Sequence, residues 1–137
     1  MIHRVTLRAF AAATEDEERI KKALSVFVPL DSISVTYVEG YFGNPMKILE
    51  AVLRKREGLS FFQMLRELLP KEDLQRLRRE VPERISGTEF HLRLDKQAAY
   101  KGIVRLTDSK DAIDVTALVE SYPAKYEEAV RVVGELL

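Results

Sequence analysis

Two segments of the chain place cations beside aromatic rings, a combination that could bind a phosphate group. The segment 39–47 holds two glycines and two aromatic residues, followed by Asn44, Pro45 and Lys47. Asn44 is typical of a helix N-cap and Pro45 of a first helical position, so free backbone N–H groups would face an anion there. The Tyr41 ring could stack on a base. The alternative is a tight turn with one aromatic residue in the core.

The segment 93–102 is the second candidate. Lys96 and Tyr100 are four residues apart, so they share one face of a helical turn. A cation beside an aromatic ring, with further donors next to it, could contact a phosphate or a single strand. The alternative is a short helical connector whose residues 98–100 pack inward. The segment supplies five candidate contacts, namely Arg93, Lys96, Gln97, Tyr100 and Lys101.

The charges of the chain cancel overall but not locally. The 22 basic and 22 acidic side chains argue against a nucleic-acid binder that relies on net charge alone. Residues 1–46 carry a net charge of −1, residues 47–105 of +5 and residues 106–137 of −4. A middle segment that faced one way would form a basic surface; the alternative is a set of solvated helices. This segment adds four candidate phosphate contacts, Lys47, Arg54, Lys55 and Arg56.

No catalytic or metal-binding motif stands out. The chain has no cysteine, which excludes a disulfide framework, a thiolate zinc site and a cysteine nucleophile. Two histidines, His3 and His91, do not make a metal site without carboxylates in reach, and no HExxH, GxSxG, Walker A or GxGxxG motif occurs. The acidic run 15–18 is explained by helix capping, because consecutive helical residues point to different faces. We therefore expect no enzyme, no cofactor and no metal.

Hydrophobic periodicity predicts an α+β fold. Alternation of apolar and polar residues predicts strands over 2–11, 33–42, 88–94, 103–106 and 112–119. A period of 3.6 residues predicts a helix after Thr14, helices between 46 and 81, and a helix that Pro123 opens, with a short helical turn over 96–101. The order βα-βαα-β-short α-ββα is typical of two layers, a mixed or antiparallel sheet of about five strands with helices on one face.

Each predicted strand has one apolar and one polar face, so one side of the sheet should be partly open. The open face would carry Arg4, Thr6, Arg8, Ser34, Thr36, His91, Arg93 and Thr116.

The length of 137 residues, without repeats or linkers, predicts a single domain over 1–137. No apolar run approaches the roughly 18 residues of a membrane span, so we expect a cytoplasmic protein that has no signal peptide and contacts no membrane.

Three stretches of the chain resemble a small archaeal family of RNA-binding proteins regarded as predicted exosome subunits. They are residues 13–20 (ATEDEERI), 39–46 (EGYFGNPM) and 93–100 (RLDKQAAY), the last together with Gly102. The three stretches occur in the family's order and span nearly the whole chain. The resemblance implies a fold similar to that of the large-subunit ribosomal protein that binds 5S RNA, and RNA binding without established catalytic residues. Histidine is common in the family where this chain has Ala13 and Tyr41, so stacking by Tyr41 is favoured over histidine chemistry.

The favoured hypothesis is a non-catalytic RNA-binding module whose partner is structured or single-stranded RNA. Through the resemblance, it would take part in archaeal RNA processing or degradation with the exosome. The alternative is a protein-interaction subunit whose open sheet face docks the exosome, another protein or a second copy without contacting RNA. A third hypothesis, an RNA nuclease, would need convergent carboxylates or histidines. Only Glu15, Asp16, Glu39 and Asp95 are scattered candidates for that role.

Overall fold

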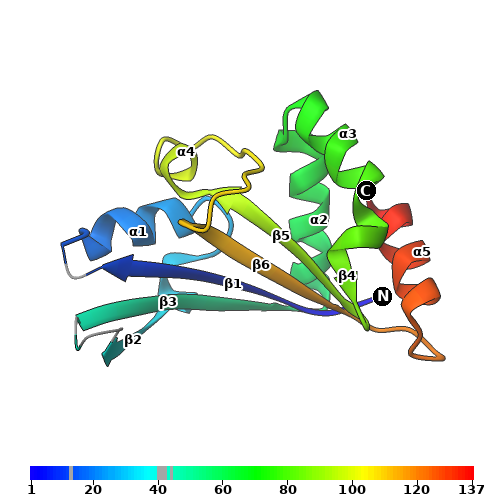
Figure 1. Cartoon of the computed structure of the whole chain (residues 1–137), viewed down its shortest axis with the longest axis horizontal. Helices are drawn as coiled ribbons and strands as arrows, with labels where there is room; N and C mark the ends of the chain where they lie inside the picture. Colours follow the sequence, from blue (N-terminus) through cyan, green and yellow to red (C-terminus); the bar gives the residue numbers. More distant parts are fainter. Residues whose placement is uncertain (13, 40–42, 44) are drawn as a thin grey trace.

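A computed structural model describes residues 1–12, 14–39, 43 and 45–137, which form six strands in one antiparallel sheet and five α-helices (Figure 1). The strands are β1 (Ile2–Ala12), β2 (Ser34–Glu39), β3 (Pro45–Arg54), β4 (Ile85–Ser86), β5 (Glu89–Asp95) and β6 (Ala112–Val119). The helices are α1 (Glu17–Leu24), α2 (Arg56–Leu68), α3 (Lys71–Arg79), α4 (Lys96–Tyr100) and α5 (Tyr126–Leu136). The sheet order β2-β3-β1-β6-β5-β4 places β1 between β3 and β6.

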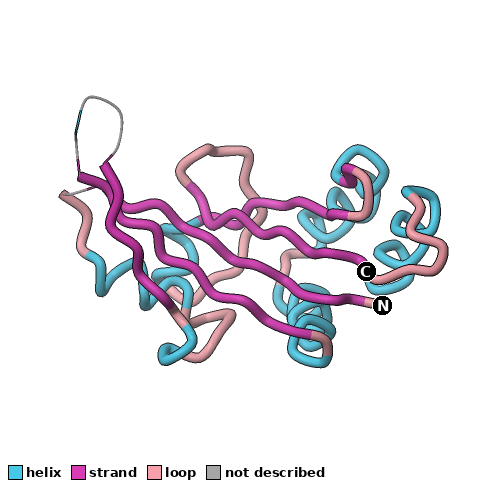
Figure 2. Tube along the Cα trace, turned by 90° about the horizontal axis from the view of Figure 1, so that it is seen from below, coloured by secondary structure: helices cyan, strands magenta, loops and turns pink. Residues whose placement is uncertain are grey.

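The helices lie on one side of the sheet, and Figure 2 shows the strands in front of them when the molecule is seen from below. Alternation along β1 explains this arrangement, because Val5, Leu7 and Ala9 are fully buried beneath the helices while their neighbours point the other way. In the core, the Phe62 ring of α2 stacks on Phe90 of β5 with centroids 6.0 Å apart. The predicted two-layer α+β architecture is confirmed, with six strands instead of about five.

The prediction of a helix over residues 46–53 is wrong, because Pro45–Arg54 is the strand β3. Leu49, Ala51 and Leu53 alternate as buried residues along it, and the strand pairs with β1 from Met46 to Arg54. The sequence fits both periods here, and pairing with β1 decides between them. No helix begins at Pro45, so the expected phosphate site at a helix N-terminus is absent there.

Other expectations hold in part. The short helix after Asp95 is confirmed, since the Asp95 carboxylate accepts a hydrogen bond from the Ala98 N–H at 2.7 Å. The segment 103–106 is not a strand and makes only one isolated bridge to β5. The C-terminal helix begins at Tyr126, not at Pro123, and the short strand β4 was not predicted. Thr14 does not cap α1; the N-cap is Asp16, which accepts from the Glu18 N–H.

Gly58 lies in α2 where the helix packs on β1. A Cβ atom there would lie 2.9 Å from Ile2 Cγ2 and 3.3 Å from Val5 Cγ2. We expect Gly58→Ala to lower the midpoint of urea unfolding, because overpacking costs about 1–3 kcal/mol and exceeds the roughly 1 kcal/mol that alanine gains in a helix.

The matched control is Gly134→Ala in α5, where no atom lies within 4 Å of the added Cβ. That variant should raise the midpoint through helix propensity alone. A Gly58→Ala midpoint at or above that of the wild type would contradict the close approach of α2 to β1.

Candidate functional site

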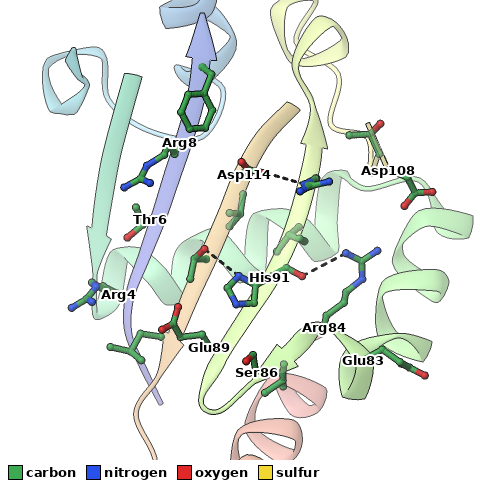
Figure 3. A pocket seen from close by; sticks show the side chains of 18 residues that line it. Arg4, Thr6, Arg8, Glu83, Arg84, Ser86, Glu89, His91, Asp108 and Asp114 are labelled. Atoms are coloured by element: carbon green, nitrogen blue, oxygen red, sulfur yellow. Dashed lines mark hydrogen bonds and ion pairs between the residues drawn. The ribbon is translucent and has the colours of Figure 1, made fainter. Parts of the chain in front are cut away.

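The face of the sheet away from the helices carries charged residues in register across the strands. Arg8 on β1 lies between Glu50 on β3 and Asp114 on β6, and Asp114 lies beside Arg93 on β5. The Arg8 Nε atom is 2.7 Å from Glu50 Oε2, and Arg93 Nε is 3.0 Å from Asp114 Oδ1 (Figure 3). Two arginine–carboxylate pairs therefore form one row across four strands.

A second row begins with two arginines that share no carboxylate. Arg4 on β1 is the direct cross-strand neighbour of Arg54 on β3, and both side chains are exposed. Among the described residues, no carboxylate oxygen lies within 4 Å of either guanidinium. Like charges directly opposite each other on a sheet are unfavourable, so this pair favours the approach of an anion.

Between these rows, polar and aromatic groups line the surface. Thr6 and Thr116 are cross-strand partners, and the Thr116 hydroxyl lies 3.3 Å from His91 Nδ1 (Figure 3). Beyond the row of Arg8, at the far end of β1, Phe10 is 39% exposed. His91 therefore bonds to Thr116 and does not meet His3, whose ring lies 4.0 Å from Glu120.

A groove of about 790 Å³ runs over this face. Its floor is formed by β1, β5 and β6, and one wall comes from the 3-10 turn Val81–Arg84 and residues 107–108 (Figure 3). Arg84 belongs to the wall, and its guanidinium bonds to Glu80 at 2.8 Å and to the His91 carbonyl at 3.5 Å. The groove thus holds four arginines on a mixed-charge surface: Arg4, Arg8, Arg84 and Arg93.

Ion pairs fix this wall. Arg76 on α3 contacts Asp108 Oδ1 at 2.5 Å and Glu80 Oε2 at 3.0 Å. The hydrogen bond from Arg76 is the main reason that the pKa of the Asp108 carboxyl and the pKa of Glu80 both lie below their usual ranges. Both carboxylates therefore stay charged at neutral pH and hold the wall against α3.

The candidate residues predicted from the sequence do not share one face. Arg54 and Arg93 lie on the open face, whereas Lys47 turns to the helix side and pairs with Glu17 at 3.7 Å. Lys55 pairs with Glu120 at 3.6 Å, and Arg56 is exposed at the start of α2. The candidates Gln97, Tyr100 and Lys101 lie in or next to α4; Tyr41 and Asn44 lie outside the described residues.

Lys96 is buried, with 2% of its surface exposed, so it does not contribute to the surface where a phosphate would bind. Its ammonium bonds to the Phe10 carbonyl at 3.2 Å, to Asp111 Oδ1 at 2.5 Å and to Glu15 Oε2 at 3.1 Å. The buried ammonium thereby joins the end of β1, the turn before α1 and the loop before β6. Its role in the structure is to hold these segments together.

Sequence reasoning placed Arg4, Arg8 and His91 on the open face but did not select them as contacts. The alternation of apolar and polar residues along the strands predicts which face these residues lie on, but it does not predict where a groove forms on that face. Arg84 was missed altogether, because it follows Pro82 in the 3-10 turn that joins α3 to the sheet.

No group of three or more histidine or acidic residues in the described part of the chain could hold a metal ion. No described helix is long and apolar enough to cross a membrane.

Comparison with known proteins identifies the family. A family model described as RNA binding matches residues 4–119. The chain belongs to this RNA-binding family. The relative named RNA-binding protein PAB1135, from Pyrococcus abyssi, is 36% identical over 98% of this chain and 93% of its own length.

Solved structures show the same fold over the full length of the chain. Protein AF2318 from Archaeoglobus fulgidus is 34% identical and superposes with a TM-score of 0.88, with 100% of both chains covered. A DUF54 protein from Methanothermobacter thermautotrophicus is 33% identical with a TM-score of 0.83, covering 100% of this chain and 98% of its own. The open antiparallel sheet is therefore a fold that this chain has in common with archaeal proteins.

The first prediction at this site concerns Lys96. Lys96→Met would leave the Phe10 carbonyl and the Glu15 carboxylate without the Lys96 ammonium, and we expect a loss of about 2 kcal/mol in the free energy of unfolding, measured in urea. The side chain of Asp111 is 66% exposed, so water can replace part of what that carboxylate loses. Lys101→Met, at an exposed neighbouring position, is the control and should change stability little; an equal loss in both variants would contradict the structural role of Lys96.

The second prediction concerns the groove wall. Arg76→Gln should raise the pKa values of Asp108 and Glu80 toward their usual ranges, as followed by NMR titration of the carboxyl groups. A carboxyl group with a lowered pKa stabilises the folded state above its ordinary pKa, and this contribution is lost as the pH falls through the lowered value. The stability advantage of the wild type over Arg76→Gln should therefore be present at neutral pH and disappear in acid.

Arg131→Gln is the control for the groove wall, because Arg131 pairs with Glu128 and Glu135 on α5. It should leave the titration of Asp108 unchanged. Unaltered pKa values of Asp108 and Glu80 in Arg76→Gln would show that Arg76 does not hold the wall in solution.

Proposed function

We propose that this protein binds RNA without catalysing its cleavage, and that the RNA lies in the groove on the open face of the sheet. The observation that carries the proposal is the uncovered sheet face with four arginines along one groove, in a chain of the RNA-binding family. An antiparallel sheet surface of this kind suits single-stranded RNA, whose splayed bases stack on side chains while its phosphates meet cations.

Arg4, which lines the groove, and its cross-strand neighbour Arg54, which lies beside the groove on β3, supply the primary phosphate contacts in this proposal. Guanidinium groups bind phosphate oxygens in a bidentate manner, and neither side chain must first leave a carboxylate. The pairs of Arg8 and Arg93 are exposed, and exposed ion pairs contribute only about 0–1 kcal/mol. A phosphate can therefore compete for these arginines at small cost.

Bases would contact two flat groups of the groove, His91 between the two arginine rows and Phe10 beyond Arg8. Phe10 is 39% exposed, and His91 lies two strands away on β5. His91 is in register with Thr6, four residues before Phe10. With roughly 4.8 Å between strands and roughly 3.4 Å per residue along them, the two side chains are on the order of 17 Å apart, which a few nucleotides can span. The non-catalytic part of the proposal is supported by the two aspartates of the groove, since Asp108 and Asp114 are both held by arginines.

The test is fluorescence anisotropy of a labelled single strand and a labelled hairpin RNA over a salt series. The variant Arg4→Glu/Arg54→Glu should bind at least tenfold more weakly. Its plot of log K against log salt should be shallower by about 1.4, since each lost contact on single strands removes roughly 0.7.

The matched control is Arg66→Glu/Arg79→Glu, which makes the same charge change at exposed positions of α2 and α3 without a described ion pair. Equal weakening in both variants would remove the groove as the binding site. Absence of wild-type binding at low salt would overturn the RNA proposal and favour the interaction-subunit alternative.

Association with the archaeal exosome is a further part of the proposal, and its support is the resemblance of residues 39–46 and 93–100 to that family. Co-purification of exosome subunits with the wild type and with Arg4→Glu/Arg54→Glu tests it. Retention of the subunits by that variant would mean that docking does not use the groove. Sedimentation of the pure protein tests, in the same preparation, the alternative in which the open sheet face docks a second copy.

A further inference from the structure

A second cluster of cations lies on the helix side of the sheet, where α1 packs against α4. The guanidinium carbon of Arg19 is 4.1 Å from the centroid of the Tyr100 ring, and the Lys22 ammonium is 4.9 Å from the same centroid. Arg19 and Lys22 are three residues apart and therefore share one face of α1. Both cations therefore contact the same aromatic ring. The guanidinium carbon of Arg19 and the ammonium of Lys22 are at most 9.0 Å apart, because each distance is measured to the same centroid.

Arg19 and Lys22 differ in their ion pairing from the lysines at this end of the molecule. Lys21 pairs with Glu17 and Glu18, Lys47 pairs with Glu17, and Lys96 pairs with Glu15. The acidic residues of the α1 region are thereby already engaged. Within the described residues, neither Arg19 nor Lys22 has a carboxylate oxygen within 4 Å, and the same is true of Lys101, which directly follows Tyr100.

The polar neighbours of this cluster add donors. Gln97 accepts a hydrogen bond from Arg19 Nη2 through its Oε1 atom at 3.5 Å. This contact orients the side-chain amide and leaves its NH₂ group with two N–H donors for another group. Arg19 and Lys22 have donors and no acceptor, so the cluster presents several donors and no negative charge.

We propose that Arg19, Lys22 and Gln97 form a binding site for a terminal phosphate of RNA, separate from the groove. A phosphomonoester carries a charge of about −1.5 to −2 at neutral pH, against −1 for an internal phosphodiester. Arg19 and Lys22 both contact the Tyr100 ring and together carry a charge of +2, which is close in magnitude to the charge of the monoester. The ring positions both cations before the ligand arrives, which reduces the entropy lost on binding.

The proposed phosphate site lies next to the end of the groove, because the two are built from consecutive segments of the chain. α4 follows β5 directly, and β5 carries Arg93 and His91 of the groove; Lys96 of α4 bonds to the carbonyl of Phe10. An RNA strand that leaves the groove past Phe10 therefore reaches the end of the sheet where α1 and α4 lie (Figure 1). The inference rests on the proposed RNA binding and adds the recognition of a strand end.

The experiment compares one oligoribonucleotide in three forms, with a 5′-phosphate, with a 3′-phosphate and with hydroxyl groups at both ends. Wild-type protein should bind one phosphorylated form about tenfold more tightly than the hydroxyl form, in anisotropy at constant salt. Arg19→Gln/Lys22→Gln should lose this preference and still bind the hydroxyl form through the groove. The end that carries the preference identifies the source of the phosphate.

Arg66→Gln/Lys71→Gln is the matched control, since it also removes one arginine and one lysine at exposed helical positions. It should keep the preference for the phosphorylated form, and circular dichroism should show that both variants are folded. Equal binding of all three forms by the wild type, or loss of the preference in the control, would overturn this inference. Binding of the hydroxyl form is the separate readout for the groove, so a failure of this inference can be distinguished from a failure of the proposed RNA binding.

Discussion

The buried ammonium of Lys96 is the contact on which both proposed sites depend. It is covered almost completely and is satisfied by the Phe10 carbonyl, Asp111 and Glu15. A buried charge is tolerated only when it is paired and hydrogen-bonded. These three contacts join the last part of β1, the turn before α1 and the loop before β6, so that Phe10 at the groove and Tyr100 beside α1 keep their places. A residue that looks like a surface cation in the sequence thus organises one end of the fold.

The second constraint is the alternation of side chains in β1, the strand in the middle of the sheet. Val5, Leu7 and Ala9 point into the core, so Arg4, Thr6 and Arg8 must point away from it. Antiparallel pairing on both sides then sets which charges meet: Arg8 lies between two carboxylates, and Arg4 lies beside Arg54. The same strand therefore contains one neutralised arginine and one available for an anion. This difference follows from register and not from residue type.

Charge distribution explains how a chain with no net charge can have binding surfaces of this kind. Half of the cations of the 47–105 segment pair with a described carboxylate, as Lys47 does with Glu17 and Arg76 does with Asp108 and Glu80. The segment therefore does not form one basic face. Among the cations without a described carboxylate partner, Arg4 and Arg54 lie side by side on the open face, and Arg19 and Lys22 lie at the Tyr100 ring on the helix side. Others, such as Arg66 and Arg79, lie singly at exposed helix positions. Local pairing, which net charge does not reveal, decides where an anion would be attracted.

Local sequence patterns determined much of this protein. Period-two alternation predicted β1, β5 and β6 and the residues of their open face, and the Asp95 cap predicted α4, because these signals act within a few residues. The likeness to the 5S RNA-binding ribosomal protein stays a prediction. Only the tertiary structure decided that Pro45–Arg54 is a strand, because pairing with β1 overrides an ambiguous period. It also decided that Lys96 is buried and that Arg19 and Lys22 meet Tyr100, since those contacts join residues up to 86 positions apart.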